Sequence, residues 1–252
     1  MQSTNLPQEI QNGIDTFIHH ARDAFGDDLV SAVLFGSAAE DGLRSTSDVN
    51  LLLVLRKFER EKTDRVREYL RTCHAQMHLE VMFLLESEIE QAMDAFAVKF
   101  VDILMRRKVL FGPDHFANVV IAPEAILRRT QQVLLNLMLR MRERYALVSL
   151  REEQLPLIIA DMTGPLRACA ASLLKLEGKP ARSPKEALAA IIAEHIGPGN
   201  ADISGQIDTA RREGTLPPGV AGSLMFALMD LAAHMHHRAS GLASPMKGAA
   251  RG

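Results

Sequence analysis

The 252-residue chain has no tryptophan, and aromatic residues make up only 5% of it. Proteins that hold single-stranded nucleic acid stack the bases on aromatic side chains, and proteins that hold a duplex carry an excess of basic residues. Here 29 lysines and arginines face 31 aspartates and glutamates, so the formal net charge is −2. The composition therefore argues against nucleic acid as a partner.

Cysteine is nearly as scarce, and the two thiols, Cys73 and Cys169, lie far apart in the chain. Neither has a second cysteine at metal-binding spacing, which excludes the usual structural zinc site. The N-terminus lacks a basic region followed by an apolar one. The longest charge-free stretch near the C-terminus, Gly214 to Met229, contains two prolines and is shorter than the ~20 apolar residues of a membrane span. We expect a cytoplasmic protein with reduced cysteines and no membrane partner.

The first part of the chain alternates between helical and strand-like patterns. Apolar residues recur at helical spacing over residues 7–26, and residues 59–76 and 86–107 are helical in pattern. Short apolar runs that contain strand-forming residues predict buried strands. These runs cover 29–35, 49–55 and 78–85, with a short edge strand at 109–111.

After Pro123 only helical patterns follow, separated by glycine and proline clusters. One long helix is predicted from Glu124 to about Leu150, with shorter helices near 153–177, 184–196, 202–213 and 219–238. The pattern predicts an α+β domain over residues 1–118 with a small mixed sheet, an all-α bundle over 119–240, and a disordered tail over 241–252.

The segment between the first two predicted strands carries the chemistry. A strand leads into Gly36-Ser37, where backbone N–H groups and the Ser37 hydroxyl could hold a phosphate at the start of a helix. Asp48 begins the next strand, and Asn50 points to the same face because strand residues alternate. If the third strand neighbours the second, Glu80 can join them to form an oxygen-donor set for a divalent ion.

Gly36, Ser37, Ser47 and Asp48, with the apolar residues after position 50, resemble the motif of the nucleotidyltransferase superfamily with the DNA polymerase β-like fold. In this family Gly-Ser is followed by Asp-x-Asp or Asp-x-Glu and by a third carboxylate on a later strand, for which Glu80 is the best match. The resemblance covers roughly the first 110 residues. The helical half is similar to the substrate domains of aminoglycoside-modifying members.

The resemblance implies Mg²⁺ or Mn²⁺ held by Asp48, Asn50 and Glu80, and a nucleoside triphosphate held by Gly36, Ser37 and Ser47. It implies catalytic roles for Asp48 and Glu80 in transferring a nucleoside monophosphate to a hydroxyl of a small molecule or protein. The nucleotide, the acceptor and the oligomeric state are left open. Asn50 departs from the family pattern, because a neutral amide replaces the second carboxylate and weakens the charge that two-metal chemistry needs.

Two alternatives remain at this point. The chain could be a nucleotide-binding or regulatory module that has lost catalysis, or a helical interaction protein with a vestigial first domain. A stripe of arginines along the long helix could receive an anionic substrate, although a solvated helix edge explains it better. The stripe consists of Arg129, Arg140, Arg144 and Arg151. His234, His236 and His237 lack an acid or cysteine to complete a metal site.

Overall fold

The computed structural model describes residues 6–40, 48–197 and 202–249, and it divides the chain into two compact units. The first comprises residues 1–93 and 103–120, and the second comprises 94–102 and 121–252. The sequence pattern placed a single border after residue 118. The structure differs in that residues 94–102 group with the helical unit, although they precede the last strand of the sheet.

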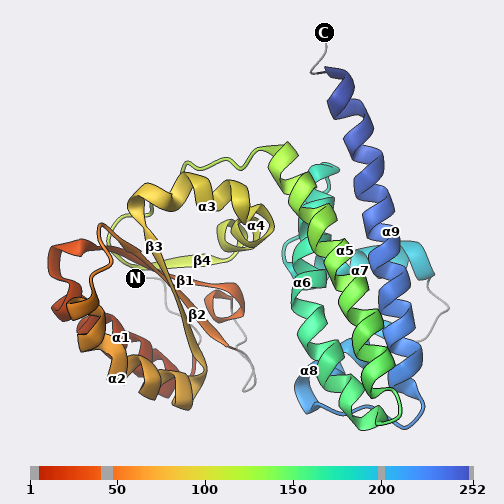
Figure 1. The fold of residues 1–252 in the computed structure, drawn as a ribbon, viewed down its shortest axis with the longest axis horizontal. Coiled ribbons are helices and arrows are strands. Elements are labelled where there is room, and N and C mark those ends of the chain that lie inside the picture. Colours follow the sequence, from red (N-terminus) through yellow and green to blue (C-terminus); the bar gives the residue numbers. More distant parts are fainter. Residues whose placement is uncertain (1–5, 41–47, 198–201, 250–252) are drawn as a thin grey trace. The chain divides into compact units, whose positions relative to one another are not determined.

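The first unit is built on a four-stranded mixed sheet in the order β3-β2-β1-β4 (Figure 1). β1 pairs antiparallel with β2 and β4, whereas β2 and β3 are parallel. Each strand lies where the apolar runs predicted it, because those runs are bounded by polar or glycine-containing turns. The strands are β1 (Leu29–Phe35), β2 (Val49–Leu55), β3 (Leu79–Leu85) and β4 (Arg107–Phe111).

Helices α1 (Gln8–Phe25) and α2 (Arg60–Met77) cover one face of this sheet (Figure 1). Phe17 and Ala21 of α1 are fully buried, and they pack in one cluster with Leu51 and Leu53 of β2 and Val66 of α2. Odd-numbered residues of β2 therefore face the two helices, and even-numbered residues face the other side of the sheet. α3 (Ile89–Ala95) and α4 (Ala97–Met105) follow β3, with a break between them at Phe96.

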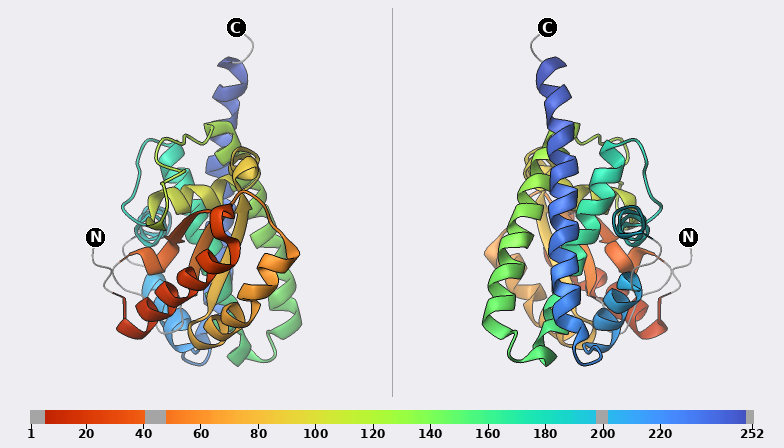
Figure 2. Two further views of the ribbon diagram at one scale, coloured as in Figure 1. Left: turned by 90° about the vertical axis from the view of Figure 1, so that its left-hand side faces the viewer. Right: turned by 90° about the vertical axis from the view of Figure 1, so that its right-hand side faces the viewer.

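The second unit is the predicted helical bundle, in which α5 and α9 run side by side (Figures 1 and 2). α6 contacts all the other long helices of the unit. α7 begins where predicted, since Ser183 accepts a hydrogen bond from the Glu186 N–H and a proline follows the cap. The helices are α5 (Pro123–Val148), α6 (Leu155–Leu176), α7 (Pro184–Ile196), α8 (Ile203–Glu213) and α9 (Val220–Ala249). α9 continues through residues that the sequence pattern assigned to a tail.

One segment of the bundle is apolar enough, by length and composition, to cross a membrane. Residues Glu152–Leu176 have a window with a mean hydropathy of 1.4, and 56% of that window is buried inside the protein. This segment was not among the membrane-span candidates expected from the sequence. Its burial against α5, α7, α8 and α9 is what the central helix of a bundle requires.

Candidate functional site

The pairing of three strands brings the motif residues to one end of the sheet. Phe35, the last residue of β1, is paired with Asn50 near the start of β2. Asn50 is in turn paired with Glu80 near the start of β3. β2 and β3 are parallel, and β1 is antiparallel to them. Gly36, which follows β1, therefore lies at the end of the sheet where β2 and β3 begin.

Asn50 and Glu80 lie on the same face of the sheet. Val49 and Leu51 belong to the core beneath α1 and α2, so Asn50 between them points to the opposite face. Residues directly opposite on paired strands share a face, and Glu80 therefore points the same way as Asn50. Asp48 is exposed, precedes β2 by one residue, and accepts a hydrogen bond on its carbonyl oxygen from the Asn50 amide, at 3.4 Å.

Gly36 occupies a position that favours glycine. Its φ is +76°, a left-handed conformation that residues with a Cβ rarely adopt. A Cβ at this position would lie 3.7 Å from Nδ2 of Asn50, so the turn passes directly beside that amide. Ser37 is half-buried, and among the described residues no side chain or backbone group is recorded as a partner of its hydroxyl.

The geometry of this turn corrects one expectation. Residues Gly36–Ala39 form a short 3-10 turn, η2, rather than the first turn of an α-helix, and the Gly36 N–H is already donated to the Arg106 carbonyl oxygen at 3.0 Å. A helix macrodipole and the Gly36 N–H are therefore not available to a phosphate. The Ser37 hydroxyl is one donor of the turn that remains. Ser47 lies outside the described residues.

Arg106 and Glu40 hold this turn, and the sequence analysis missed both. The Arg106 guanidinium lies 3.2 Å from the Glu40 carboxylate, while its backbone carbonyl oxygen accepts from Gly36. The Arg106 side chain is only 17% exposed, so the ion pair is partly shielded from water. Arg106, the residue just before β4, thus contacts both ends of η2. No local motif signals this pairing, because 66 residues separate its two partners.

His74, at the end of α2, lies beside Glu80. Its Nδ1 is 3.4 Å from the Glu80 carboxylate and 3.2 Å from the Leu79 carbonyl oxygen. Both neighbours are acceptors, so Nδ1 carries the hydrogen and donates. α2 ends at His78, whose left-handed φ of +50° turns the chain into β3. This contact orients the Glu80 side chain, which is 58% exposed.

The donor set fits a hard divalent ion. Asp48 and Glu80 supply carboxylate oxygens and Asn50 an amide oxygen, the chemistry that Mg²⁺ and Mn²⁺ prefer. The protein contributes two negative charges instead of the three that the family motif provides. Among the described residues no group of three or more histidine, cysteine, aspartate or glutamate side chains is arranged to hold a metal. The roles of Asp48, Asn50 and Glu80 as ligands stay predictions.

The predicted arginine stripe is not a uniform feature of one helix, because α5 ends at Val148 and Arg151 lies beyond it. Arg140, Arg144 and Arg151 are exposed. Arg129 is half-buried, donates to Gln132 at 2.8 Å and lies 5.7 Å from the centre of the Phe96 ring. Arg129 therefore has a packing role within the helical unit, while the other three have the exposure of a solvated helix edge.

The remaining sequence candidates are structural. His234 is half-buried and stacks on His195, with ring centres 3.9 Å apart. Burial, with His195 as the next cause, holds the pKa of His234 below its usual value. Cys73 and Cys169 are buried free thiols, and burial raises the pKa of Cys169 to about 12.

Comparison with known proteins identifies the fold. No family model matches the chain. A spectinomycin adenyltransferase from Enterococcus faecalis, solved with ATP and spectinomycin, superimposes with a TM-score of 0.59 at 13% identity, covering 93% of this chain and 100% of its own. This chain has the nucleotidyltransferase fold. The fold that the resemblance implied is therefore confirmed.

A shorter match comes from sequence. A protein of Methanocaldococcus jannaschii named "Putative protein adenylyltransferase" is 38% identical over 56 residues, which are 22% of this chain. The matched part spans 38% of the length of that relative. The α+β nucleotidyltransferase domain followed by a helical domain, expected from the motif, is the architecture that the structure has.

Proposed function

We propose that this protein transfers a nucleoside monophosphate from a metal-bound nucleoside triphosphate to a hydroxyl group of a small molecule or a protein. The observation that carries the proposal is the strand pairing that places Gly36, Asn50 and Glu80 together at one edge of the sheet. The two relatives support the same reaction class, since one is named for spectinomycin adenylylation and the other for protein adenylylation.

In the proposed reaction the acceptor oxygen forms a bond to the α-phosphorus, and the bond from the α-phosphorus to the bridging oxygen breaks, so pyrophosphate leaves. The Ser37 hydroxyl donates to an outer phosphate oxygen, and Arg106 with Glu40 keeps the turn in place. Asp48, Asn50 and Glu80 would hold the divalent ion, which when bound neutralises developing charge on the phosphate oxygens. Glu80 is the base within the set that can take the acceptor proton.

Asn50 favours a second candidate function, which is nucleotide binding without rapid transfer. With Asn50 the site supplies one negative charge fewer, so a nucleotide that arrives with its own ion can bind while turnover is slow. The protein would then act as a nucleotide-binding or regulatory module. The two candidates differ in the wild type: an enzyme releases pyrophosphate without any change at position 50, whereas a binding module holds the nucleotide and releases pyrophosphate slowly or not at all.

The decisive variant is Asn50→Asp, measured beside the wild type. Binding of each nucleoside triphosphate with Mg²⁺ or Mn²⁺ is followed by calorimetry, and pyrophosphate release is followed across a panel of hydroxyl acceptors. Charge stabilisation at one position of a catalytic site is worth on the order of 10²–10³ in rate. We expect nucleotide binding by both proteins, and release by Asn50→Asp that is faster by up to about 10².

The matched control is Asn12→Asp, which adds the same charge on α1, over the other face of the sheet. It should leave both measurements unchanged, while Asp48→Asn should abolish release. Brisk release by the wild type with no gain from Asn50→Asp would show that a neutral ligand suffices. If neither protein binds any nucleotide, the nucleotide site is wrong in both forms.

A further inference from the structure

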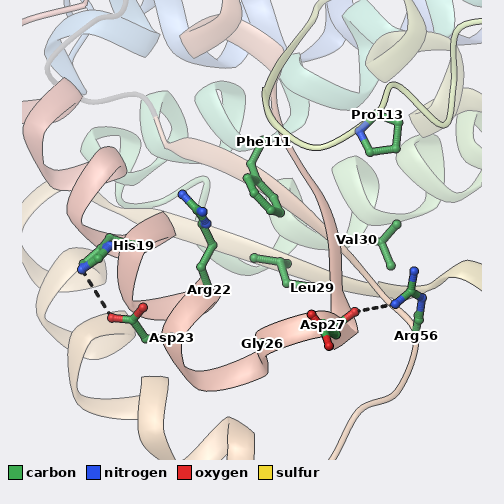
Figure 3. Close-up of a pocket in the computed structure, with 10 residues that line it drawn as sticks. All are labelled: His19, Arg22, Asp23, Gly26, Asp27, Leu29, Val30, Arg56, Phe111 and Pro113. Carbon is green, nitrogen blue, oxygen red and sulfur yellow. Dashed lines mark hydrogen bonds and ion pairs between the residues drawn. The ribbon is translucent and has the colours of Figure 1, made fainter.

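A second cavity lies at the opposite end of β1 from the Gly36 turn. Its volume is about 630 Å³, which is within the range of small-molecule sites. It is open to solvent on one side, and Figure 3 shows that the residues lining it come from the end of α1, the start of β1 and the segments that follow β2 and β4. β1 spans seven residues, about 20 Å at 3.3 Å per residue, so this cavity is remote from the motif residues.

Two arginines face the cavity from different elements. Arg22 comes from the last turn of α1, and its guanidinium lies 4.7 Å from the centre of the Phe111 ring. Arg56 follows β2, and its Nη1 donates to the Asp27 carbonyl oxygen at 2.8 Å. Among the described residues neither guanidinium has an ion pair with a carboxylate. Each is held in position by a ring or a carbonyl and keeps further N–H donors.

The floor between the two arginines is apolar. It is formed by Leu29, which is 4% exposed, and by the half-buried Val30 and Phe111 (Figure 3). β4 meets β1 closely here, because a Cβ on Gly112 would lie 2.1 Å from the Val30 carbonyl oxygen. The backbones of β1 and β4 are therefore in close contact on this side of the cavity.

Two acidic residues of the cavity limit where a ligand can place negative charge. Asp23 lies 3.3 Å from His19, and Asp27 lies on the rim. Two arginines against two aspartates leave the cavity nearly neutral, which disfavours a dense charge such as a polyphosphate. In Figure 3 the guanidiniums of Arg22 and Arg56 lie on opposite sides of the apolar floor. Negative charge is thus accepted at two separated points.

We propose that this cavity binds a small dicarboxylic acid with an apolar spacer. One carboxylate is held by Arg22 and the other by Arg56, in the planar geometry that guanidinium and carboxylate share. The spacer lies on Leu29, Val30 and Phe111. The site is independent of the nucleotide site, so it is tested on the full-length protein with neither nucleotide nor divalent ion present.

The test is a length series of straight-chain dicarboxylates from succinate to suberate, with hexanoate as the monocarboxylate of similar apolar area. Affinity is measured by calorimetry, and the site is located by amide chemical shifts, with the Gly26 and Gly112 signals expected to move and the Gly36 signal to stay. We expect an optimum length that binds about tenfold more tightly than hexanoate, because it adds one charge-assisted contact.

Arg22→Gln and Arg56→Gln should each reduce the affinity of the best dicarboxylate to that of hexanoate. Arg71→Gln, an exposed arginine of α2, is the matched control and should change nothing. The proposal is overturned if hexanoate binds as tightly as every dicarboxylate, if both cavity variants bind like the wild type, or if no dicarboxylate shifts the Gly26 or Gly112 signal at about 10 mM. The shift measurement needs only the wild type, so a variant that fails to fold does not prevent a decision.

Discussion

Gly112→Ala tests how closely β4 packs on β1. Gly112 follows β4 with a φ of +74°. A Cβ there would lie 2.1 Å from the Val30 carbonyl oxygen and 3.0 Å from the Ser31 Cα. Both are backbone atoms, so no side-chain rotation relieves the clash, and the two strands must move apart.

Gly36→Ala is the matched comparison in the same unit. Its φ of +76° is nearly identical, but its Cβ would meet only Nδ2 of Asn50, at 3.7 Å, which is ordinary contact. The left-handed backbone costs each alanine variant about 1–2 kcal/mol. Only Gly112→Ala adds an overpacking penalty of about 1–3 kcal/mol. We expect losses in the free energy of unfolding of about 1–2 kcal/mol for Gly36→Ala and about 2–5 kcal/mol for Gly112→Ala.

The assay is urea unfolding followed by circular dichroism, with hydrogen exchange of peptides from β1 to report on the first unit by itself. Faster exchange in residues 29–35 of Gly112→Ala than of Gly36→Ala would locate the damage at the β1–β4 pair. Equal losses for the two variants would refute the reasoning, because the strained φ alone would then account for both.

Two further predictions concern titration and thiol chemistry. Burial raises the pKa of Asp114, but hydrogen bonds from Arg107 and the Phe116 N–H outweigh it, so this pKa lies below its usual value. The Asp114 carboxylate should therefore stabilise the fold above about pH 4 and lose that contribution as the pH falls through the lowered pKa. Asp114→Asn should make the free energy of unfolding less dependent on pH in the acid range. Cys169, with its pKa of about 12, should not react with a thiol reagent at pH 8 until urea unfolds the bundle. Cys169→Ser should abolish the labelling step that coincides with unfolding. Labelling of Cys169 in the native protein would contradict its burial.

Local pattern was sufficient for most of the fold. Apolar runs with β-branched residues are bounded by turns, and this predicted the strands because a buried strand needs little beyond its own hydrophobicity. The helices of the second unit were predicted because glycine and proline end a helix whatever surrounds it. Gly36, Ser37 and Asp48 were recognisable because they match a family motif that is contained in one short segment of the sequence.

What the chain could not reveal locally is which distant residues support those positions. Glu40 and Arg106 are 66 residues apart, and only the antiparallel pairing of β1 with β4 brings them together. The face that Glu80 occupies depends on its register with Asn50, and a slip of one residue would have turned it into the core.

The arginine stripe and the arginine pair of the cavity also differ in how far the sequence predicts them. The arginine stripe was visible because helical spacing puts Arg129, Arg140 and Arg144 on one element, although the structure ends α5 before Arg151. Arg22 and Arg56 belong to different elements and became neighbours of one cavity only when α1 packed against the sheet. Periodicity within one element is encoded by side-chain hydrophobicity over a few turns, and the sequence alone determines it. Contacts between elements depend on strand order, register and the direction of packing, and these are decided only when the whole core forms.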